Sequence, residues 1–474
     1  MVEFEKKVEK LPRITKKERR TLEFEKKKEV CVLAAAGMLG SSFDQDGFYQ
    51  ALEHHPDVIG CDSGTSDSGP FFPGAGVPRM NRKAAKRDLE LMIREGVARG
   101  IPVLVGSAGT AGADPNVDWM IDIVREIAAE QKIHFKLAEI KTEISRETLK
   151  RYMDAGKLHP LEGAPAFGEA DLERITRVIS VIGCEPYIEA IRNGAQVVIA
   201  GRSSDTAIYA AVPTLYGLGN GFAWHAGKVL ECGTLSTVFE KKHGAMLAWV
   251  REDSVSIEPG DKDMACSPVS IVSHTLYENS NPFQLVEPGL VMRIDESRYE
   301  AETDRRVRIT GTKLERTPMT IKLEGVRFEG YRRTAIGGVS DPLILGQLDA
   351  WLEHVKQDAQ AKIQRGMGIA PDQYRYRTVV YGNPKDPDTE TVGVLFDIIA
   401  ASPEDADGII SNVWHTALHV PIPDWTGAQS QTAFPFSPPD LQTRNGGETY
   451  SFCLNHVIDV DDPLETCRIR YEDL

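Results

Sequence analysis

Short apolar segments alternate with longer amphipathic ones over the first 250 residues. Two neighbouring parallel strands need a long crossover, usually a helix, so this alternation is typical of βαβ units on a parallel sheet. We expect strands at residues 30–36, 58–61, 101–105, 134–144, 175–183 and 195–201, with helices at 81–100, 116–132, 146–156, 184–194 and 204–217. The pattern predicts a Rossmann-like α/β domain over residues 30–250.

The remainder of the chain has a different texture. Residues 251–474 combine strands of the antiparallel or mixed type with a long helix at 341–366 and a shorter one at 403–419. We expect a second domain there, of the α+β class. Residues 1–29 are charged throughout and mix acidic with basic side chains, so we interpret them as a solvated N-terminal arm.

The charge balance limits the partners. The 70 Asp and Glu residues outnumber the 55 Lys and Arg residues, for a formal net charge of −15. Nucleic-acid binding depends on clustered cations, so no nucleic-acid partner is expected. No apolar run reaches the roughly 20 residues that a membrane span needs, and the N-terminus has no apolar core of a signal peptide. We therefore predict no membrane association.

The seven cysteines are odd in number and widely spaced, without a CxxC pair. Such spacing indicates neither a disulfide framework nor a zinc module. Reduced thiols in a cytoplasm are the expectation.

Four polar, glycine-rich loops follow the predicted strands. They cover residues 34–47, 61–70, 106–115 and 201–207. Ligands of open α/β sheets bind beyond the carboxyl ends of the strands, and Gly- and Ser-rich loops let backbone N–H groups converge on an anion. Any one loop is explained as well by helix caps and tight turns. Four on one sheet edge favour a binding site for a carboxylate or a phosphate.

Acid–base chemistry is expected from Asp62, Asp67, Asp205 and His225. Residues expected to bind substrate are Ser63, Gly64, Ser66, Ser107, Gly109, Arg202, Ser203, Ser204, His274 and Ser340. Arg202 would hold a carboxylate with two parallel hydrogen bonds. Each residue also has a structural interpretation: the aspartates as helix caps, and His225 as a hydrogen-bonded core histidine.

No cofactor is predicted. The chain has no HExxH, EF-hand or Walker A motif, and GMLGSSFDQDG at residues 37–47 lacks the third glycine of a dinucleotide fingerprint. A divalent metal held by the loop aspartates together with Asp44 or Asp46 is the alternative. Cys61 and Cys232 are alternative nucleophiles, although buried small residues explain them more simply.

Two polar segments stand out in the second half. HTLYENSNPF at 274–283 carries His274, and AIGGVSDPLIL at 335–345 precedes the long helix. Ser340 or Asp341 is expected to cap that helix, and the segment to form the far wall of a cleft between the two domains.

Several long motifs resemble the acyclic terpene utilisation (AtuA-type) family. They are CDSGTSDSGP, VIAGRSSDTAIYAAVPTLYGLGNGFAWHAGKVLECG, HTLYENSNP, TIKLEGVRFEGYR, GVSDPLIL, TAFPFSPPDL and VIDVDDPLE, in order from about residue 30 to about residue 470. The resemblance implies cytoplasmic catabolism of a branched or unsaturated carboxylic acid or its acyl-CoA, without naming a reaction. Some family members carry an extra C-terminal domain; if that domain is needed here, a separate small subunit would supply it.

The combined expectation is a cytoplasmic enzyme, forming a homo-oligomer, that acts on a hydroxylated or unsaturated carboxylic acid or its CoA thioester. Hydration, dehydration or isomerisation by acid–base catalysis needs no redox cofactor. The alternatives are a hydrolase or acyl-transfer enzyme with a Cys or Ser nucleophile, and a non-catalytic subunit of a larger enzyme.

Overall fold

A computed structural model describes residues 22–421 and 443–474, except residues 65, 240, 241 and 387. Most of the predicted N-terminal arm and the motif TAFPFSPPDL therefore lie outside the described residues. Among the described residues, none of the helices combines the length and the apolar character that a membrane span requires.

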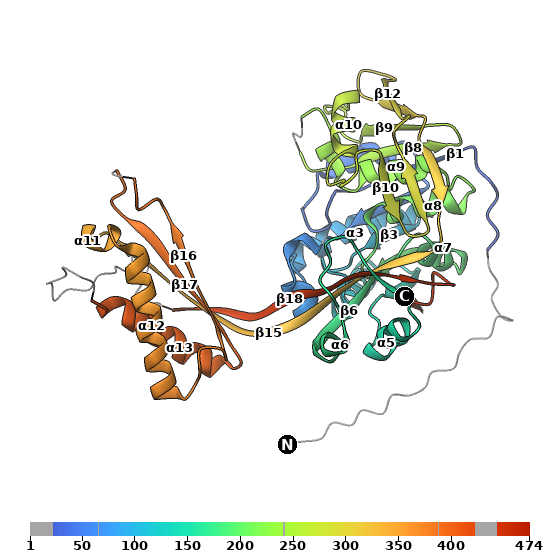
Figure 1. Cartoon of the computed structure of the whole chain (residues 1–474). Helices are drawn as coiled ribbons and strands as arrows, with labels where there is room; N and C mark the ends of the chain where they lie inside the picture. The colour runs from blue at the N-terminus through green and yellow to red at the C-terminus, as the bar shows by residue number, and fades with distance from the viewer. Residues whose placement is uncertain (1–21, 65, 240–241, 387, 422–442) are drawn as a thin grey trace.

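The body of the protein is built on one ten-stranded mixed sheet (Figure 1). Its parallel centre has the order β1 (Glu29–Ala34), β2 (Val58–Asp62), β3 (Val103–Gly106), β7 (Val197–Ala200) and β4 (Lys136–Lys141). Antiparallel strands extend both edges: β8 (Met246–Arg251), β9 (Val255–Pro259), β13 (Val307–Thr310) and β12 (Arg298–Ala301) beside β1, and β19 (Arg468–Asp473) beside β4. The predicted α/β class with a parallel sheet is confirmed.

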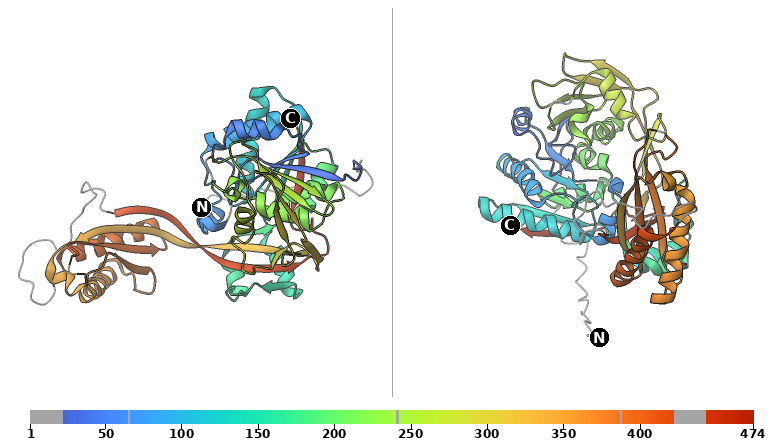
Figure 2. Two further views of the ribbon diagram at one scale, coloured as in Figure 1. Left: turned by 90° about the horizontal axis from the view of Figure 1, so that it is seen from above. Right: turned by 90° about the vertical axis from the view of Figure 1, so that its left-hand side faces the viewer.

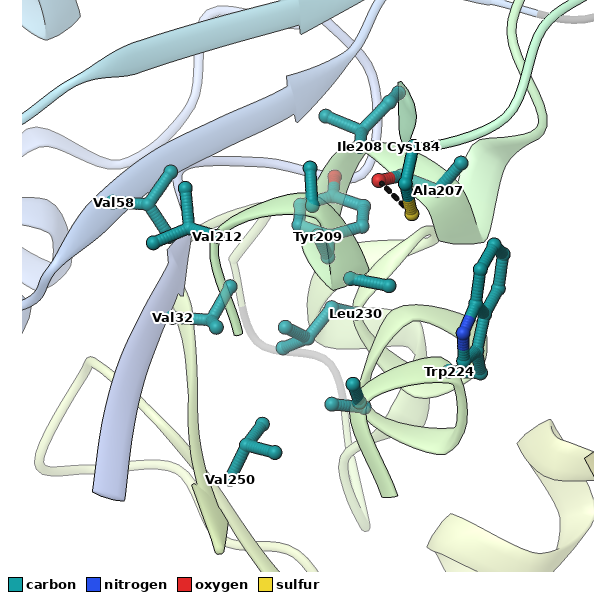
Figure 3. Packing of buried hydrophobic residues seen from close by; sticks show 14 of the residues in the cluster. Val32, Val58, Cys184, Ala207, Ile208, Tyr209, Val212, Trp224, Leu230 and Val250 are labelled. Atoms are coloured by element: carbon teal, nitrogen blue, oxygen red, sulfur yellow. Dashed lines mark hydrogen bonds between the residues drawn. The ribbon is translucent and has the colours of Figure 1, made fainter. Parts of the chain in front are cut away.

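Helices cover both faces of the sheet, because alternate strand residues point to opposite sides. Leu33 and Ile59 pack under α1 (Gln45–Leu52), α3 (Arg82–Arg99) and α4 (Asp114–Gln131). Val32 and Val58 pack under α7 (Glu185–Arg192), α8 (Asp205–Leu215) and α9 (Gly221–Leu230). Figure 3 shows this second core, with Tyr209 and Val212 of α8 and Leu230 of α9 turned toward the strand valines.

Smaller elements complete the body. They are the turns η1 (Ser66–Ser68) and η2 (Gly233–Ser236), the helices α2 (Phe71–Ala75), α5 (Arg146–Asp154), α6 (Glu169–Arg174) and α10 (Pro268–Thr275), the strand β5 (Leu158–Pro160), and a three-stranded sheet of β10 (Gln284–Glu287), β11 (Leu290–Arg293) and β14 (Lys313–Arg316).

Strands from both halves of the sequence share the large sheet. The predicted boundary after residue 250 falls within β8, and β8 forms a hairpin with β9 in which Val250 lies opposite Val255. The last strand of the chain, β19, returns to pair with β4. Local patterns predict strands but carry no information on such long-range pairing, so the composition change at 250 does not coincide with a break in the sheet.

A distal lobe projects from the body on a two-stranded ribbon (Figures 1 and 2). The ribbon is formed by β15 (Thr320–Val339) and β18 (Thr443–Asp459), which pair antiparallel over most of their length. At the body end, β15 also pairs with β6 (Ile175–Val181). The strand predicted at 175–183 therefore belongs to the sheet of the ribbon and not to the ten-stranded sheet.

The distal lobe has the βαββαβ topology of a split βαβ fold. Its elements are β15, α11 (Pro342–Leu345) and α12 (Leu348–Met367), β16 (Arg375–Tyr381), β17 (Val392–Ala400), α13 (Pro403–His419) and β18. The strands have the order β16-β17-β15-β18 with antiparallel neighbours. The helix predicted at 341–366 is broken at Gly346 and Gln347 into α11 and α12.

The lobe has a core of its own, centred on Trp351 of α12 and Phe396 of β17, both with no exposed surface. We expect Trp351→Ala to lower the free energy of unfolding by about 3–5 kcal/mol, the usual cost of truncating a buried aromatic side chain. Urea unfolding followed by circular dichroism measures the loss. Leu343→Ala, at a side chain 45% exposed in the same lobe, is the control and should change stability little. An equal loss in both variants would contradict this core.

Candidate functional site

A cavity of about 340 Å³ lies beyond the carboxyl ends of β1 and β2 and at the start of α8. Its lining residues are Gly37, Met38, Ser41, Asp62, Gly64, Asp67, Asp205, Glu231, Cys232, Thr234, Leu235, His243, Tyr277 and Glu278. The position is the one that ligands occupy in open α/β sheets. A larger cavity, about 500 Å³, lies around Asp57 and Pro102 at the opposite ends of the strands, away from the four glycine-rich loops.

Two glycines bring the segment after α9 over the end of β1. A Cβ atom built on Gly37 would lie 2.4 Å from the carbonyl carbon of Cys232, and one on Gly233 would lie 2.5 Å from the amide nitrogen of Gly37. Gly233 also has a φ of +58°, a left-handed conformation that favours glycine. This backbone contact places Glu231 and Cys232 in the cavity wall.

Asp62 ends β2 at the floor of the cavity and is 6% exposed. One of its carboxyl oxygens accepts a hydrogen bond from the Gly64 amide at 3.2 Å, while Oδ1 is buried without a hydrogen-bond partner in the described structure. Burial raises the pKa of Asp62 well above its usual range, and the neighbouring Asp205 carboxylate adds to the rise, against the opposing charge of Arg202. The Asp62 carboxyl group therefore favours its protonated form.

Asp205 stands at the first turn of α8, and Arg202 holds its side chain. The Arg202 Nη1 atom donates to Asp205 Oδ1 at 2.9 Å and to Ser107 Oγ at 2.9 Å, and Arg202 Nε lies 3.6 Å from a carboxylate oxygen of Glu324 on β15. Arg202 is 7% exposed and is not among the lining residues. Its guanidinium group fixes a carboxylate of the protein itself.

A second ion pair, between Lys228 and the lining residue Glu231, is buried at the cavity. Lys228 on α9 donates from Nζ to Glu231 Oε1 at 2.6 Å, and both side chains are less than a tenth exposed. Burial raises the pKa of Glu231 to about 8, against the lowering effect of Lys228.

Glu287 of β10 is hydrogen-bonded to the start of α8. Its two carboxyl oxygens accept hydrogen bonds from the hydroxyl groups of Ser204 and Thr206, the residues on either side of Asp205. Burial raises the pKa of Glu287 to about 7, against the lowering effect of these two hydrogen bonds. Ser204, which we expected to bind substrate, therefore anchors the helix that carries Asp205.

Comparison with known proteins identifies the family. The family described as acyclic terpene utilisation family protein AtuA matches residues 79–435, about three quarters of the 474-residue chain. The chain belongs to the acyclic terpene utilisation family. This confirms the resemblance carried by the sequence motifs, and membership is consistent with a catabolic role. No curated protein and no solved structure matches the chain significantly.

Four of the residues predicted for the site line the cavity of this family member: Asp62, Gly64, Asp67 and Asp205. The candidate site thus gathers acidic side chains from the loop after β2 and from the start of α8.

Four other predicted residues are not among those that line the cavity: Ser63, Ser107, Gly109 and Ser203. Ser63 is fully buried, with its Oγ 3.8 Å from the Met80 sulfur, and Ser203 Oγ is hydrogen-bonded to the Tyr187 hydroxyl at 2.7 Å. Ser107 accepts from Arg202, and the Gly109 carbonyl accepts from the Arg79 amide. Ser66 belongs to the turn η1. In these loops the small residues serve mainly the packing of the site.

Two predicted residues are not brought to the cavity. His225 has no exposed surface: its ring nitrogens lie 2.7 Å from Thr312 Oγ1 and 3.2 Å from Thr275 Oγ1, and burial lowers its pKa to about 3. His225 therefore has the environment of a hydrogen-bonded core histidine, which was the alternative to an acid–base role. Ser340 lies in the distal lobe, hydrogen-bonded to Thr391, so the expected far wall of the cleft is not formed by this segment.

The sequence did not indicate Glu231, Tyr277 and Glu278 as site residues, and it offered Cys232 only as an alternative nucleophile, yet all four line the cavity. All four belong to motifs that had been singled out, GKVLECG and HTLYENSNP. What the sequence lacks is the tertiary contact that folds both segments over the strand ends.

The environment of Glu287 predicts a pH dependence of stability. Because its pKa is about 7 in the folded protein and ordinary in the unfolded chain, the folded state binds the proton more tightly. Its contribution is fully present below about pH 4.5 and is lost as the pH rises through about 7, at up to about 1.4 kcal/mol per pH unit. Asp205 acts in the same direction as burial, and Lys228 opposes it.

We expect Glu287→Gln to remove this contribution, so that urea-derived stability falls less steeply in the variant than in the parent protein between about pH 5 and about pH 7. Glu189→Gln, at a carboxylate on α7 outside the cavity, is the control and should keep the parent slope. Identical slopes in Glu287→Gln and the parent would show that Glu287 ionises normally.

Proposed function

We propose that this family member is a catabolic enzyme that adds water to a carbon–carbon double bond, or removes water to form one, by acid–base catalysis. The substrate class is a branched, hydroxylated or unsaturated carboxylic acid or its CoA thioester. Family membership supports the catabolic context and the branched carbon skeleton. The reaction class is supported by the side chains of the cavity.

The observation that carries the proposal is the pairing of Asp62 with Asp205 in one cavity wall. Asp62 is buried and its pKa is raised, while Asp205 is held by the Arg202 guanidinium group. Two carboxyl groups whose environments differ in this way can act as acid and base in one turnover. Asp62 is the proposed general acid, and Asp205 the proposed general base.

In the dehydration direction, the Asp205 carboxylate removes a proton from the carbon next to the acyl group. The electron pair forms the carbon–carbon double bond as the bond to the hydroxyl group breaks. Asp62 gives its proton to the departing hydroxyl, which leaves as water. Hydration is the reverse: the Asp62 carboxylate takes a proton from the attacking water molecule, and protonated Asp205 returns a proton to the carbon next to the acyl group.

The lining also orients the proposed substrate. Five of the lining residues are Asp or Glu, so a substrate carboxylate placed among them would be repelled. The hydroxylated or unsaturated carbons therefore point inward, and the acyl end faces the mouth. Met38, Leu235 and Tyr277 are partly exposed at the cavity and would contact the hydrocarbon branch.

The nucleophile alternative has less support. Cys61 has no exposed surface, its thiol lies 3.3 Å from the Asp62 carbonyl oxygen, and burial raises its thiol pKa well above the usual value. A nucleophilic thiol needs access and a lowered pKa. The non-catalytic subunit, the separate small subunit, the homo-oligomer and the cytoplasmic location stay predictions from the sequence.

The test is turnover of branched enoyl and 3-hydroxyacyl thioesters and of their free acids by the purified full chain. Turnover is measured as loss of the enoyl absorbance on hydration and as its gain on dehydration. We expect Asp205→Asn and Asp62→Asn each to lower kcat/KM by about 10²- to 10⁴-fold, the usual contribution of a general acid or base. Asp372→Asn, at an exposed carboxylate of the distal lobe, is the matched control and should keep the parent rate.

Unchanged turnover in Asp205→Asn and Asp62→Asn would refute the assignment of these two residues. Neither turnover nor a thermal shift with any acid or thioester would favour the non-catalytic subunit, since a ligand at 100 times its Kd stabilises by about 2.7 kcal/mol.

A further inference from the structure

Three potential metal ligands meet at the edge of the cavity. Glu231 and Cys232 follow α9, and His274 lies in the last turn of α10. One ligand atom from each side chain, a carboxylate oxygen, the thiol sulfur and a ring nitrogen, lie within 4.8 Å of one another. Among the described residues, this is the one set of three such side chains close enough to share an ion, and it differs from the aspartate set suggested by the sequence.

His274 provides a second, independent observation. Its side chain is 6% exposed, and its Nε2 atom is buried without a hydrogen-bond partner in the described structure. The Tyr277 ring stacks on the imidazole, with the centroids 5.8 Å apart and the planes at 22°. A buried polar atom without a partner costs free energy unless a ligand satisfies it. The stacked, immobilised ring is thus suited to bind an ion.

We propose that Glu231, Cys232 and His274 form a binding site for a zinc-type divalent cation. Nitrogen, sulfur and oxygen donors together are typical of Zn²⁺, whereas Mg²⁺ and Ca²⁺ prefer oxygen ligands alone. Three protein ligands are also the number found in catalytic zinc sites, which leave a fourth position open. Because Glu231 and Cys232 line the cavity, that position faces the space proposed for the substrate.

The surrounding charges accommodate such an ion. Lys228 donates to Glu231 Oε1 at 2.6 Å, so the metal takes the other oxygen of the carboxylate. Cys232 binds as the thiolate, releasing its proton to solvent when the cation enters. The charge of the cation is then offset by this thiolate, the Glu231 carboxylate and the nearby Asp205, which interacts electrostatically with Glu231.

The open position would take an oxygen of the substrate, either a hydroxyl group or a thioester carbonyl. Zinc polarises such an oxygen as a Lewis acid. The metal site itself does not rest on the proposed reaction, because binding of the ion is measured without substrate.

The test uses the full-length protein, stripped with a chelator and reloaded with Zn²⁺ or Co²⁺ alone. We expect one tightly bound zinc ion per chain, and a thiolate-to-cobalt charge-transfer band in the near ultraviolet for the Co²⁺ form. Cys232→Ser should abolish this band, and His274→Gln should weaken zinc binding by more than the roughly 10- to 100-fold that loss of an outer-shell partner costs. Cys467→Ser and His419→Gln, at positions outside the cavity, are the matched controls and should bind like the parent.

A measurement on the parent protein covers the case of variants that fail to fold. Zinc should protect Cys232 from alkylation by a maleimide, as read by mass spectrometry of its peptide, and should leave the labelling of Cys467 unchanged. No bound zinc, no thiolate band, or equal labelling of Cys232 with and without zinc would each overturn the proposal. Failure of these binding measurements in a protein that still turns over substrate would refute the metal site alone, whereas zinc binding without turnover would refute the proposed reaction alone, so the two failures are distinguishable.

Discussion

The candidate site depends on one buried guanidinium group. Arg202 donates to Ser107 in the loop after β3 and to Asp205 at the start of α8, and its Nε lies near Glu324 on β15. One side chain therefore ties two strand-end loops to the ribbon that carries the distal lobe. A buried cation without its carboxylates would cost several kcal/mol, so these groups must come together for the chain to fold.

This arrangement also gives the carboxyl groups of Asp62 and Asp205 different electrostatic surroundings. Asp205 has a cation at hydrogen-bonding distance, whereas the buried carboxyl group of Asp62 accepts a hydrogen bond from the Gly64 amide, and its Oδ1 atom has no partner in the described structure. With the neighbouring charge already placed on Asp205, ionisation of Asp62 would put a second negative charge in a buried wall. Because Arg202 holds Asp205 and not Asp62, Asp205 is the proposed base and Asp62 the proposed acid.

Local patterns in the sequence predicted the parallel sheet, the strand-end loops and the inclusion of Asp62, Asp67 and Asp205, because each depends on residues close in the chain. They did not predict the distal lobe or its ribbon, whose strands β15 and β18 pair across more than 100 residues. His225 was predicted as an acid–base residue because of the chemistry of its imidazole ring. Its hydrogen-bond partners Thr275 and Thr312 lie 50 and 87 residues away in the chain, so the sequence did not indicate them. The omission of Glu231 has the same cause, since its place in the cavity depends on the contact between Gly37 and Gly233.

The most direct test of this account is the ionisation of Asp62 in the ligand-free protein. Carbon-13 labelling of aspartate carboxyl groups, with the Asp62 signal assigned by its loss in Asp62→Asn, gives the pKa by NMR. We predict that Asp62 titrates well above the ordinary aspartate pKa of about 3.9. An Asp62 carboxyl group that titrates in the ordinary range would contradict its proposed role as the general acid.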